Sequence, residues 1–436
     1  MASVSLLALA SRVHREDRWG KLYVNLLSFL KALGVKVKPL GVVTGLTPVK
    51  RWPGLQSRIA KNPRPLLLVH LTGGTSRVAV EAAKWSNQPF VLLAHNQQNS
   101  LPSALEAKVK LEALGLKPKL FLMGSLGSGK AVKLTVPRPR KVFKGSMAII
   151  GPVRPFDIAP PALLASRALV KVVYVSYRSL MRAYKLTIVG DEGLKAFKLS
   201  PGLTVEVPDE ELKRSLRLCL AVKEVLRKVK CSAFTFDCFS FLQRSGITPC
   251  LTISILGSEG YVGVCEADVQ ASTAMLIASQ AGLRPCFMAN IASADTKLNT
   301  LTLAHCTAAR VLAKPGGTVK LLPHFESQRS VSLEVPIEGG PVTLIGVSPS
   351  LSSVLMVEGE VIRSSLGIPT LCRTQVEVKV SRDVEGLLHW WVGGHVVLVK
   401  NHVARTLTES FKLRGFQAVR HLVKRNPHKP RRAKLR

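Results

Sequence analysis

The chain has 436 residues, 47% of them hydrophobic, and its 62 Lys and Arg against 27 Asp and Glu give a net charge of +35. This length and apolar content exclude a disordered chain and a single small domain, and they predict two or three folded domains. No apolar run reaches the roughly 18 residues that cross a bilayer, so we expect no membrane partner.

The positive charge is spread over the whole chain. The basic residues of the tail from Lys424 to Arg436 supply only a fifth of the excess. Such a surface attracts nucleic acid without specificity. The chain has no recognisable nucleic-acid module, however, and its 6% of aromatic residues is poor for base stacking. We therefore expect nucleic acid to be an incidental partner.

Cysteine usage and the N-terminus indicate a cytoplasmic protein. The eight cysteines include no Cys-x-x-Cys pair, which argues against a zinc ribbon, and several lie inside apolar segments, as free thiols do in a reducing compartment. The apolar run from Val4 to Ala10 has no basic region before it, so it predicts a first strand rather than a signal peptide, with an amphipathic organelle-targeting sequence as the alternative.

The first third of the chain alternates predicted strands and helices. Its nearly continuous apolar runs are typical of strands buried on both faces, as in parallel sheets. In chain order the elements are strand Ser3–Ala10, helix Arg18–Leu33, strand Val35–Val43, strand Pro65–Leu71, helix Thr75–Trp85, strand Phe90–Ala94 and helix Leu101–Leu114. The last helix is expected to begin with a capping box of Ser103 and Glu106. The pattern predicts a doubly wound α/β domain over residues 1–135, with ligands at the carboxyl ends of its strands.

A glycine-rich segment, Gly124 to Lys130, matches the first seven positions of a nucleotide phosphate loop. The eighth position is Ala131 instead of Ser or Thr, and β-branched residues and prolines stand where a helix should begin. A flexible connection is favoured over nucleotide binding, and the basic, proline-containing segment from Val136 to Lys144 is expected to be a linker.

A second α/β domain is predicted over residues 136–312. A long helix is well marked by an acidic first turn and a basic last turn. The predicted elements are helix Asp209–Lys228, strands Ala233–Phe236, Thr248–Leu256 and Tyr261–Cys265, and helix Val269–Gln280.

Short alternating runs between Gly, Pro and Ser then predict an antiparallel β-rich domain over 313–424, before a basic tail, 425–436. Its predicted strands are Val319–Leu322, Val331–Val335, Val342–Val347, Ser353–Val357, Gln375–Val380 and Val396–Val399, and a helix, Val403–Arg414, follows them. The expected fold is thus two doubly wound parallel-sheet α/β domains followed by a C-terminal antiparallel β-rich domain.

Two carboxylates, Glu266 and Asp268, close the apolar run Tyr261–Cys265. If that run is a strand, residues two apart point to one face, and their mutual repulsion would be relieved by a hard divalent cation. The alternative is an ordinary strand-to-helix junction in which Asp268 caps the following helix.

Three further segments carry candidate binding residues. Gly73, Gly74 and Thr75 close one buried strand and open a helix, and the two glycines allow backbone N–H groups to approach a ligand. The segment from His95 to Asn99 places polar side chains at the next strand end, where a polyol could be recognised. A tight turn and helix capping explain these two segments equally well.

The third segment, His389 to His395, contains Trp390, and His395 opens an apolar strand beside two glycines. His395 could complete a carboxylate-and-imidazole metal site with Glu266 and Asp268. Structural roles are the alternative for His395, and packing is the default for His305.

Taken together, these segments resemble the L-fucose/L-arabinose isomerase superfamily, in particular its fucose-isomerase-like branch. The motifs follow one another in the same order over nearly the whole chain. They are Leu71-Thr-Gly-Gly-Thr75, Ala94-His-x-x-x-Asn99-Ser-Leu-Pro-x-Ala-Leu-Glu106, Cys265-Glu-Ala-Asp268, Leu303-Ala-His-Cys-Thr307 and the Gly394-His395 strand.

The resemblance implies a divalent metal, of the Mn²⁺ type, and assembly as a homotrimer or homohexamer. It makes Asp268 and His395 metal ligands, with Asp237 as the nearest counterpart of a further carboxylate ligand and Glu266 as its substitute. The sugar-binding residues expected from the matching segments are Gly73, Gly74, Thr75, His95, Asn99 and Trp390.

The implied activity is metal-dependent interconversion of an aldose and a ketose through an ene-diol, a step of carbohydrate metabolism. Asp237, Glu266 and Asp268 are the candidate catalytic carboxylates, with Asp237 or Glu266 as the base. The charge of +35 would suit a phosphorylated or sulfonated sugar better than a neutral one. The alternative is a catalytically inactive descendant of the fold that binds RNA or another polyanion through its basic surface.

Overall fold

The computed structural model describes residues 3–11, 16–32, 36–44, 54–86, 88–114, 116, 118–123, 145–152 and 160–422. The predicted phosphate-loop segment Gly124 to Lys130, the predicted linker Val136 to Lys144 and the basic tail lie outside these residues. None of the described helices combines the length and apolar content that a membrane crossing needs.

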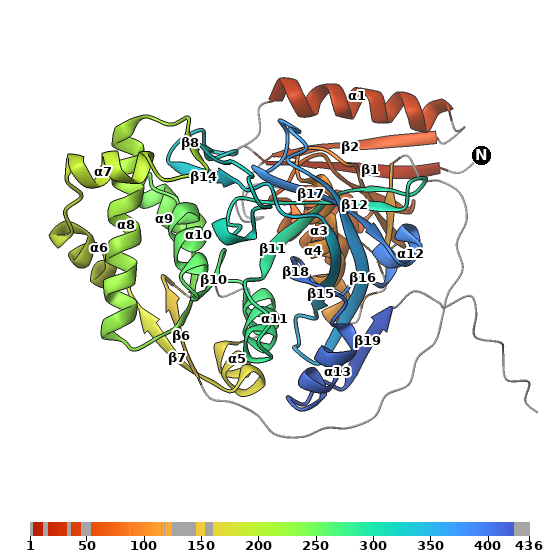
Figure 1. Cartoon of the computed structure of the whole chain (residues 1–436). Helices are drawn as coiled ribbons and strands as arrows, with labels where there is room; N and C mark the ends of the chain where they lie inside the picture. The colour runs from red at the N-terminus through yellow and green to blue at the C-terminus, as the bar shows by residue number, and fades with distance from the viewer. Residues whose placement is uncertain are drawn as a thin grey trace, which may run out of the picture.

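The first domain is built on a five-stranded parallel sheet with the strand order β2-β1-β3-β4-β5. Its strands are β1 (Ser3–Ala10), β2 (Lys36–Thr44), β3 (Leu66–His70), β4 (Phe90–Ala94) and β5 (Lys119–Leu122). Its helices are α1 (Glu16–Ala32), α2 (Leu55–Ala60), α3 (Ser76–Trp85) and α4 (Ser100–Ala113). Most apolar side chains of β1 and β3 are buried, because helices cover both faces of a parallel sheet, and these runs are therefore nearly continuous in the sequence. Figure 1 shows α1 along the outer side of β1 and β2.

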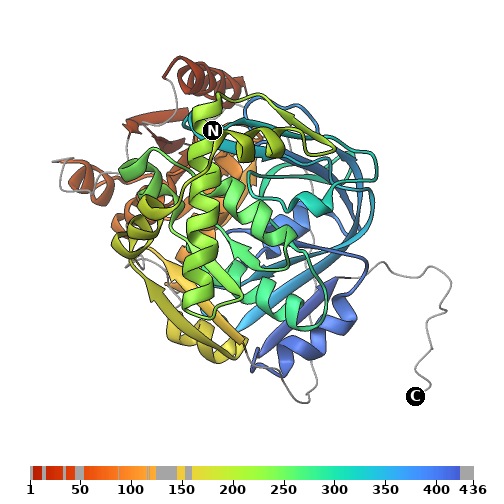
Figure 2. The same cartoon turned by 60° about the vertical axis from the view of Figure 1, so that its left-hand side comes forward.

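A second parallel sheet has the order β10-β9-β6-β7. It consists of β6 (Gly145–Ile150), β7 (Val170–Val175), β9 (Ala233–Phe236) and β10 (Val262–Val264). The helices of this region are α5 (Pro161–Ala168), α6 (Tyr177–Leu186), α7 (Asp191–Lys198), α8 (Asp209–Lys228), α9 (Cys238–Ser245), α10 (Cys250–Ser258) and α11 (Val269–Gln280). The long α8 crosses the front of this region in Figure 2.

The third unit is an antiparallel barrel. Six strands pair in the order β15-β18-β11-β12-β17-β16, and β16 pairs back with β15 to close the ring, while β19 adds to β16 in parallel. The strands are β11 (Phe287–Asp295), β12 (Thr300–His305), β15 (Gly340–Val347), β16 (Ser353–Ser364), β17 (Thr374–Val380), β18 (Val396–Lys400) and β19 (Ala418–Leu422). A small sheet joins β13 (Val319–Pro323), β14 (Val331–Glu334) and β8 (Leu203–Val205). The remaining helices are the short 3₁₀ helix η2 (Arg310–Leu312), α12 (Val384–Trp390) and α13 (Ala404–Lys412).

The expected fold class is confirmed: two parallel α/β units precede an antiparallel β-rich one. The barrel takes β11 and β12 from the chain before residue 313, and β8 pairs with β13 across the same point. The domain boundaries given above stay a prediction.

Two local predictions are wrong. Residues Thr248–Leu256 were expected to form a strand, but α10 covers this region and is buried along most of its length. An apolar run without polar interruptions carries no period that separates a buried helix from a buried strand. The expected capping box is also absent: Asn99 precedes α4 with φ 54°, and Ser103 Oγ accepts a hydrogen bond from Thr75 N at 2.9 Å instead of capping its own helix.

Candidate metal centre

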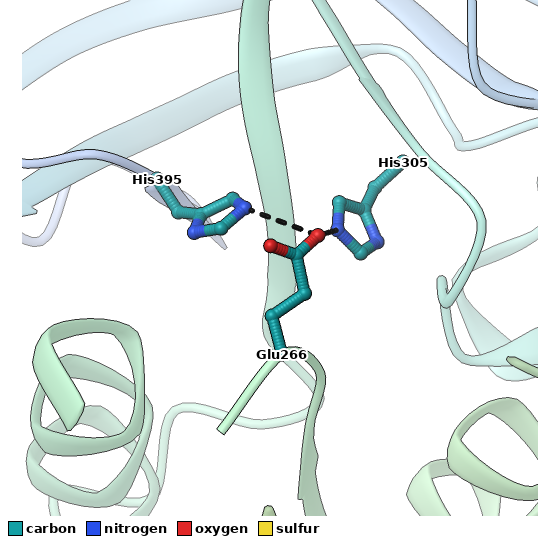
Figure 3. Close-up of side chains that lie close together, drawn as sticks. All are labelled: Glu266, His305 and His395. Carbon is teal, nitrogen blue, oxygen red and sulfur yellow. Dashed lines mark ion pairs between the residues drawn. The ribbon is translucent and has the colours of Figure 1, made fainter. Parts of the chain in front are cut away.

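Three side chains from distant parts of the chain converge beside β10. Glu266 Oε1 lies 3.6 Å from His305 Nε2 and 3.7 Å from His395 Nε2. One ligand atom from each residue lies within 4.8 Å of the others. Figure 3 shows the two imidazole rings approaching the Glu266 carboxylate from opposite sides.

The position of Glu266 depends on an unusual turn. β10 ends at Val264, and Glu266 and Ala267 adopt φ of 61° and 51°. Left-handed backbone costs a non-glycine residue roughly 1–2 kcal/mol. Hydrogen bonds from Ala267 N to Phe236 O, at 3.0 Å, and from Asp268 N to Cys265 O, at 3.2 Å, hold the turn. Non-glycine strain of this kind is concentrated at functional sites.

Asp268 contacts His395 from the other side of the ring. Its Oδ2 accepts the Nδ1–H of His395 at 2.7 Å, and its Oδ1 accepts the N–H of Ala271 at 2.6 Å, capping α11. The helix-cap alternative is therefore correct, and both carboxylates still reach one imidazole. They do so from a turn and a cap, not from one face of a strand.

The barrel supplies both histidines. His305 ends β12, is 4% exposed, and its Nδ1 is hydrogen-bonded with Thr307 Oγ1 at 2.8 Å. His395 directly precedes β18. Because β12 and β18 pair with the two edges of β11, residues 305 and 395 lie on either side of the same strand. In each ring Nδ1 is engaged by the protein, which leaves Nε2 directed at Glu266.

This donor set fits a first-row divalent cation. Two imidazole nitrogens and one carboxylate oxygen are a common ligand combination for such ions. Ligand atoms about 2.1 Å from one ion lie roughly 3–4 Å apart, which brackets the separations of 3.6 and 3.7 Å in the structure. A partner on the second nitrogen of each ligating histidine is also typical of metal sites.

The electrostatic interactions in the centre favour the charged forms of Glu266 and His395. Burial opposes ionisation of Glu266, but the two histidines outweigh it and hold the pKa of Glu266 well below its usual range. Burial likewise opposes protonation of His395, yet Glu266 and Asp268 raise the pKa of that ring well above 6.5. The centre is thus built to concentrate negative charge around an imidazole or a cation.

A small cavity of about 40 Å³ adjoins the centre. Asn99, Glu266, His305, His324 and Glu326 are among the residues that line it. Asn99 Nδ2 donates to Glu326 Oε1 at 3.3 Å, which links the first domain to the centre. Burial, and then the charge of Glu266, raise the pKa of Glu326 to about 7. The cavity has room for a few waters, less than the roughly 300–1,000 Å³ of a small-molecule pocket.

Two of the other predicted site residues, Asp237 and Trp390, lie outside the three-residue group. Asp237 is wholly buried at the end of β9, where its Oδ1 accepts the N–H of Ser240 at 3.4 Å, and it is not part of the three-residue group. Trp390, at the end of α12, lies under the Arg420 guanidinium at 5.3 Å and does not line the cavity.

The strand-end turns of the first domain pack on one another. Gly73 N donates to Gln98 O at 2.7 Å, and a Cβ on Gly73 would lie 2.8 Å from Asn99 Cβ, so only glycine fits this approach. Gly74 has φ 69°. Thr75 Oγ1 donates to Thr72 O at 2.9 Å.

His95 joins the two strand ends. Its Nε2 donates to Leu71 O at 3.1 Å, its Nδ1 accepts from Gln97 N at 3.2 Å, and burial lowers its pKa to about 4. Of the six predicted sugar-binding residues, Asn99 alone is among those lining the cavity at the centre.

The sequence analysis did not identify His305 and Glu326 as residues of this site. His305 carried a weak signal, because it stands in one of the motifs shared with the isomerase superfamily, but its apolar neighbours indicated packing. Glu326 lies in a turn between β13 and β14, and nothing in its local sequence marks it.

Comparison with known proteins gives one informative similarity. The chain is 26% identical over 222 residues to a sulfoquinovose isomerase of Alkalicoccus urumqiensis, which is 48% of this chain and 49% of that protein. The chain therefore spans about half the length of the curated relative it matches. No family model matches the chain.

Proposed function

We propose that the protein is a metal-dependent aldose–ketose isomerase whose centre is Glu266, His305 and His395. The observation that carries this proposal is the convergence of one carboxylate and two imidazole Nε2 atoms, each ring being held through its other nitrogen. The similarity to a sulfoquinovose isomerase supports the same reaction class. It also agrees with the fucose-isomerase-like resemblance. We further propose that the protein is soluble and acts in the cytoplasm.

Glu266, His305 and His395 would hold the ion, and Asp268 would keep His395 in the tautomer that leaves Nε2 free. When bound, a divalent ion such as Mn²⁺ polarises the sugar carbonyl and stabilises the negative charge that develops on oxygen. Asp268 is then a positioning residue and not a direct ligand.

The reaction also needs a group that takes the proton from C2 and returns it at C1. Three carboxylates remain candidates: Asp237, Glu266 and Glu326. Glu326 lines the cavity without belonging to the ligand group, and a pKa of about 7 matches the range in which a general base or acid works best.

The finer proposals concern the substrate and the assembly. We propose an aldose with an anionic group, a sulfonate in the first instance, because the relative's name and the charge of +35 agree on this class. We further propose a homotrimer or homohexamer, in which a neighbouring subunit helps to enclose a sugar that the cavity of about 40 Å³ is too small to hold. The RNA-binding alternative is not favoured by these observations.

A substrate panel tests the proposal. We expect the full chain, loaded with Mn²⁺, to convert a 6-sulfonated aldose into its ketose, measured by chromatography, and to act less well on phosphorylated and neutral aldoses. A chelator should stop the reaction, and added Mn²⁺ should restore it, because removing the ion removes the stabilisation of the developing oxyanion. Failure to convert any aldose by a folded protein that binds Mn²⁺ would contradict the proposed activity.

A further inference from the structure

A surface groove lies between α6, α8 and α9. It has a volume of about 390 Å³, within the range of small-molecule sites. Phe241 and Arg244 of α9 line this groove, whereas Cys238 and Leu242 of the same helix line the cavity beside Glu266. One helix therefore borders two separate hollows, and the labelled α6, α8 and α9 lie together in Figure 1.

The lining of the groove is largely apolar and aromatic. Met181 and Tyr184 come from α6, and Phe241 and Ile247 come from α9 and the chain just after it. Tyr177 is fixed, because its hydroxyl donates to Asp237 O at 2.6 Å and its ring lies 5.3 Å from that of Phe241. A rigid apolar and aromatic wall favours a flat ring over a flexible polar chain.

Three arginines surround this wall, and two of them have no carboxylate partner among the described residues. Arg214 is engaged, since it pairs with Glu211 at 2.9 Å and donates to Ser245 O at 2.8 Å. Arg178 and Arg244 are exposed, and neither has an ion-pair partner among the residues that the structure describes. The Arg244 guanidinium lies over the Tyr177 ring at 5.7 Å, a contact that leaves its N–H groups available to an anion.

The neighbourhood of these two arginines strengthens their preference for an anion. The helix α6 contributes three basic residues and no acidic one. Guanidinium groups bind phosphate through paired hydrogen bonds, and two such groups match a phosphate monoester, which carries about −1.5 to −2 charges at pH 7.

We propose that this groove binds an organic phosphate with a planar aromatic part, of the nucleoside monophosphate class. The ring would lie against Tyr177 and Met181, the partly exposed apolar side chains of this wall, and Arg178 and Arg244 would hold the phosphate. The site is distinct from the Glu266 centre, and the proposal stands whether or not the protein is an isomerase.

Calorimetric titration of the full chain with adenosine monophosphate, at about 150 mM salt to screen diffuse attraction, tests this site. We expect saturable binding with one site per chain, and weaker binding of both adenosine and inorganic phosphate. The variant R178Q/R244Q should bind at least tenfold more weakly. The control R182Q/R405Q removes the same charge from two exposed arginines that do not line the groove, and it should change affinity less than twofold.

Three results would overturn the proposal: no saturable binding, an equal loss of affinity in the control variant, or inorganic phosphate binding as tightly as the nucleotide. An equal loss in the control would assign the attraction to the overall positive charge. Because all four arginines are exposed, both variants should keep the far-ultraviolet circular dichroism of the parent protein.

Discussion

Replacing Glu266 with Gln is expected to lower the rate of aldose isomerisation by about a thousandfold or more. The change keeps the size of the side chain but removes the only carboxylate of the three-residue group. A bound ion contributes several kcal/mol of charge stabilisation in the transition state, and each 1.4 kcal/mol is a factor of ten in rate. The measurement is kcat/KM with saturating Mn²⁺.

A matched control for this variant is Glu377→Gln. Glu377 lies in β17 of the barrel and is another glutamate that is mostly buried, its side chain being 9% exposed, but it pairs with Arg363 at 2.6 Å and does not line the cavity. We expect its kcat/KM to stay within about threefold of the parent value. Equal activity of the two variants would mean that Glu266 is not at the reaction centre.

Replacing Asp268 with Asn is expected to weaken Mn²⁺ binding by about 10- to 100-fold, the usual cost of removing a hydrogen-bond partner behind a metal ligand. An amide that donates to His395 Nδ1 would place the ring proton on Nε2, the nitrogen that faces Glu266. The dissociation constant can be followed through the paramagnetic resonance signal of free Mn²⁺.

The control for that change is Asp383→Asn. Asp383 caps α12 through Gly386 N at 2.7 Å, as Asp268 caps α11, but no histidine of the described part of the chain is hydrogen-bonded to it. The weakened helix cap should cost both variants a similar free energy of unfolding, about 1 kcal/mol or less, and Asp268→Asn should lose more because it also weakens the bond to His395. Mn²⁺ affinity should fall in Asp268→Asn alone. A loss of affinity in both variants would show that the effect acts through stability.

The fold could be predicted from the sequence where local patterns are strong. The bounds of β4, β9, α8 and α11 agree with the prediction to the residue, because turn residues or charged ends mark them. The helix α10 could not be identified in this way. Apolar residues occupy all of its faces, so its sequence shows no amphipathic period.

The candidate site also has a part that could be predicted from local sequence and a part that could not. The closeness of Glu266 and Asp268 is local, and the sequence predicted that both would approach one point. Their actual geometry depends on left-handed backbone at Glu266 and Ala267, which neither residue type favours on its own. Tertiary contacts impose it.

The partnership of His305 and His395 is not local at all. It arises from the pairing of β12 and β18 with the two edges of β11, and strand register of this kind is set by the whole barrel. Asp237, which the resemblance made a candidate ligand, follows β9 of the second parallel sheet and caps α9, and it is not part of the three-residue group.

The most direct test of the account is the number of Mn²⁺ ions that the protein binds tightly, counted by paramagnetic resonance in the parent, His305→Gln and His324→Gln. His324 is a second buried histidine of the same cavity, hydrogen-bonded with Ser327, and is not one of the three proposed ligands. We predict one tight site in the parent and in His324→Gln, and at least about 100-fold weaker binding in His305→Gln, since a direct ligand should cost no less than a group behind one. Unchanged Mn²⁺ binding in His305→Gln would contradict the assignment of this centre.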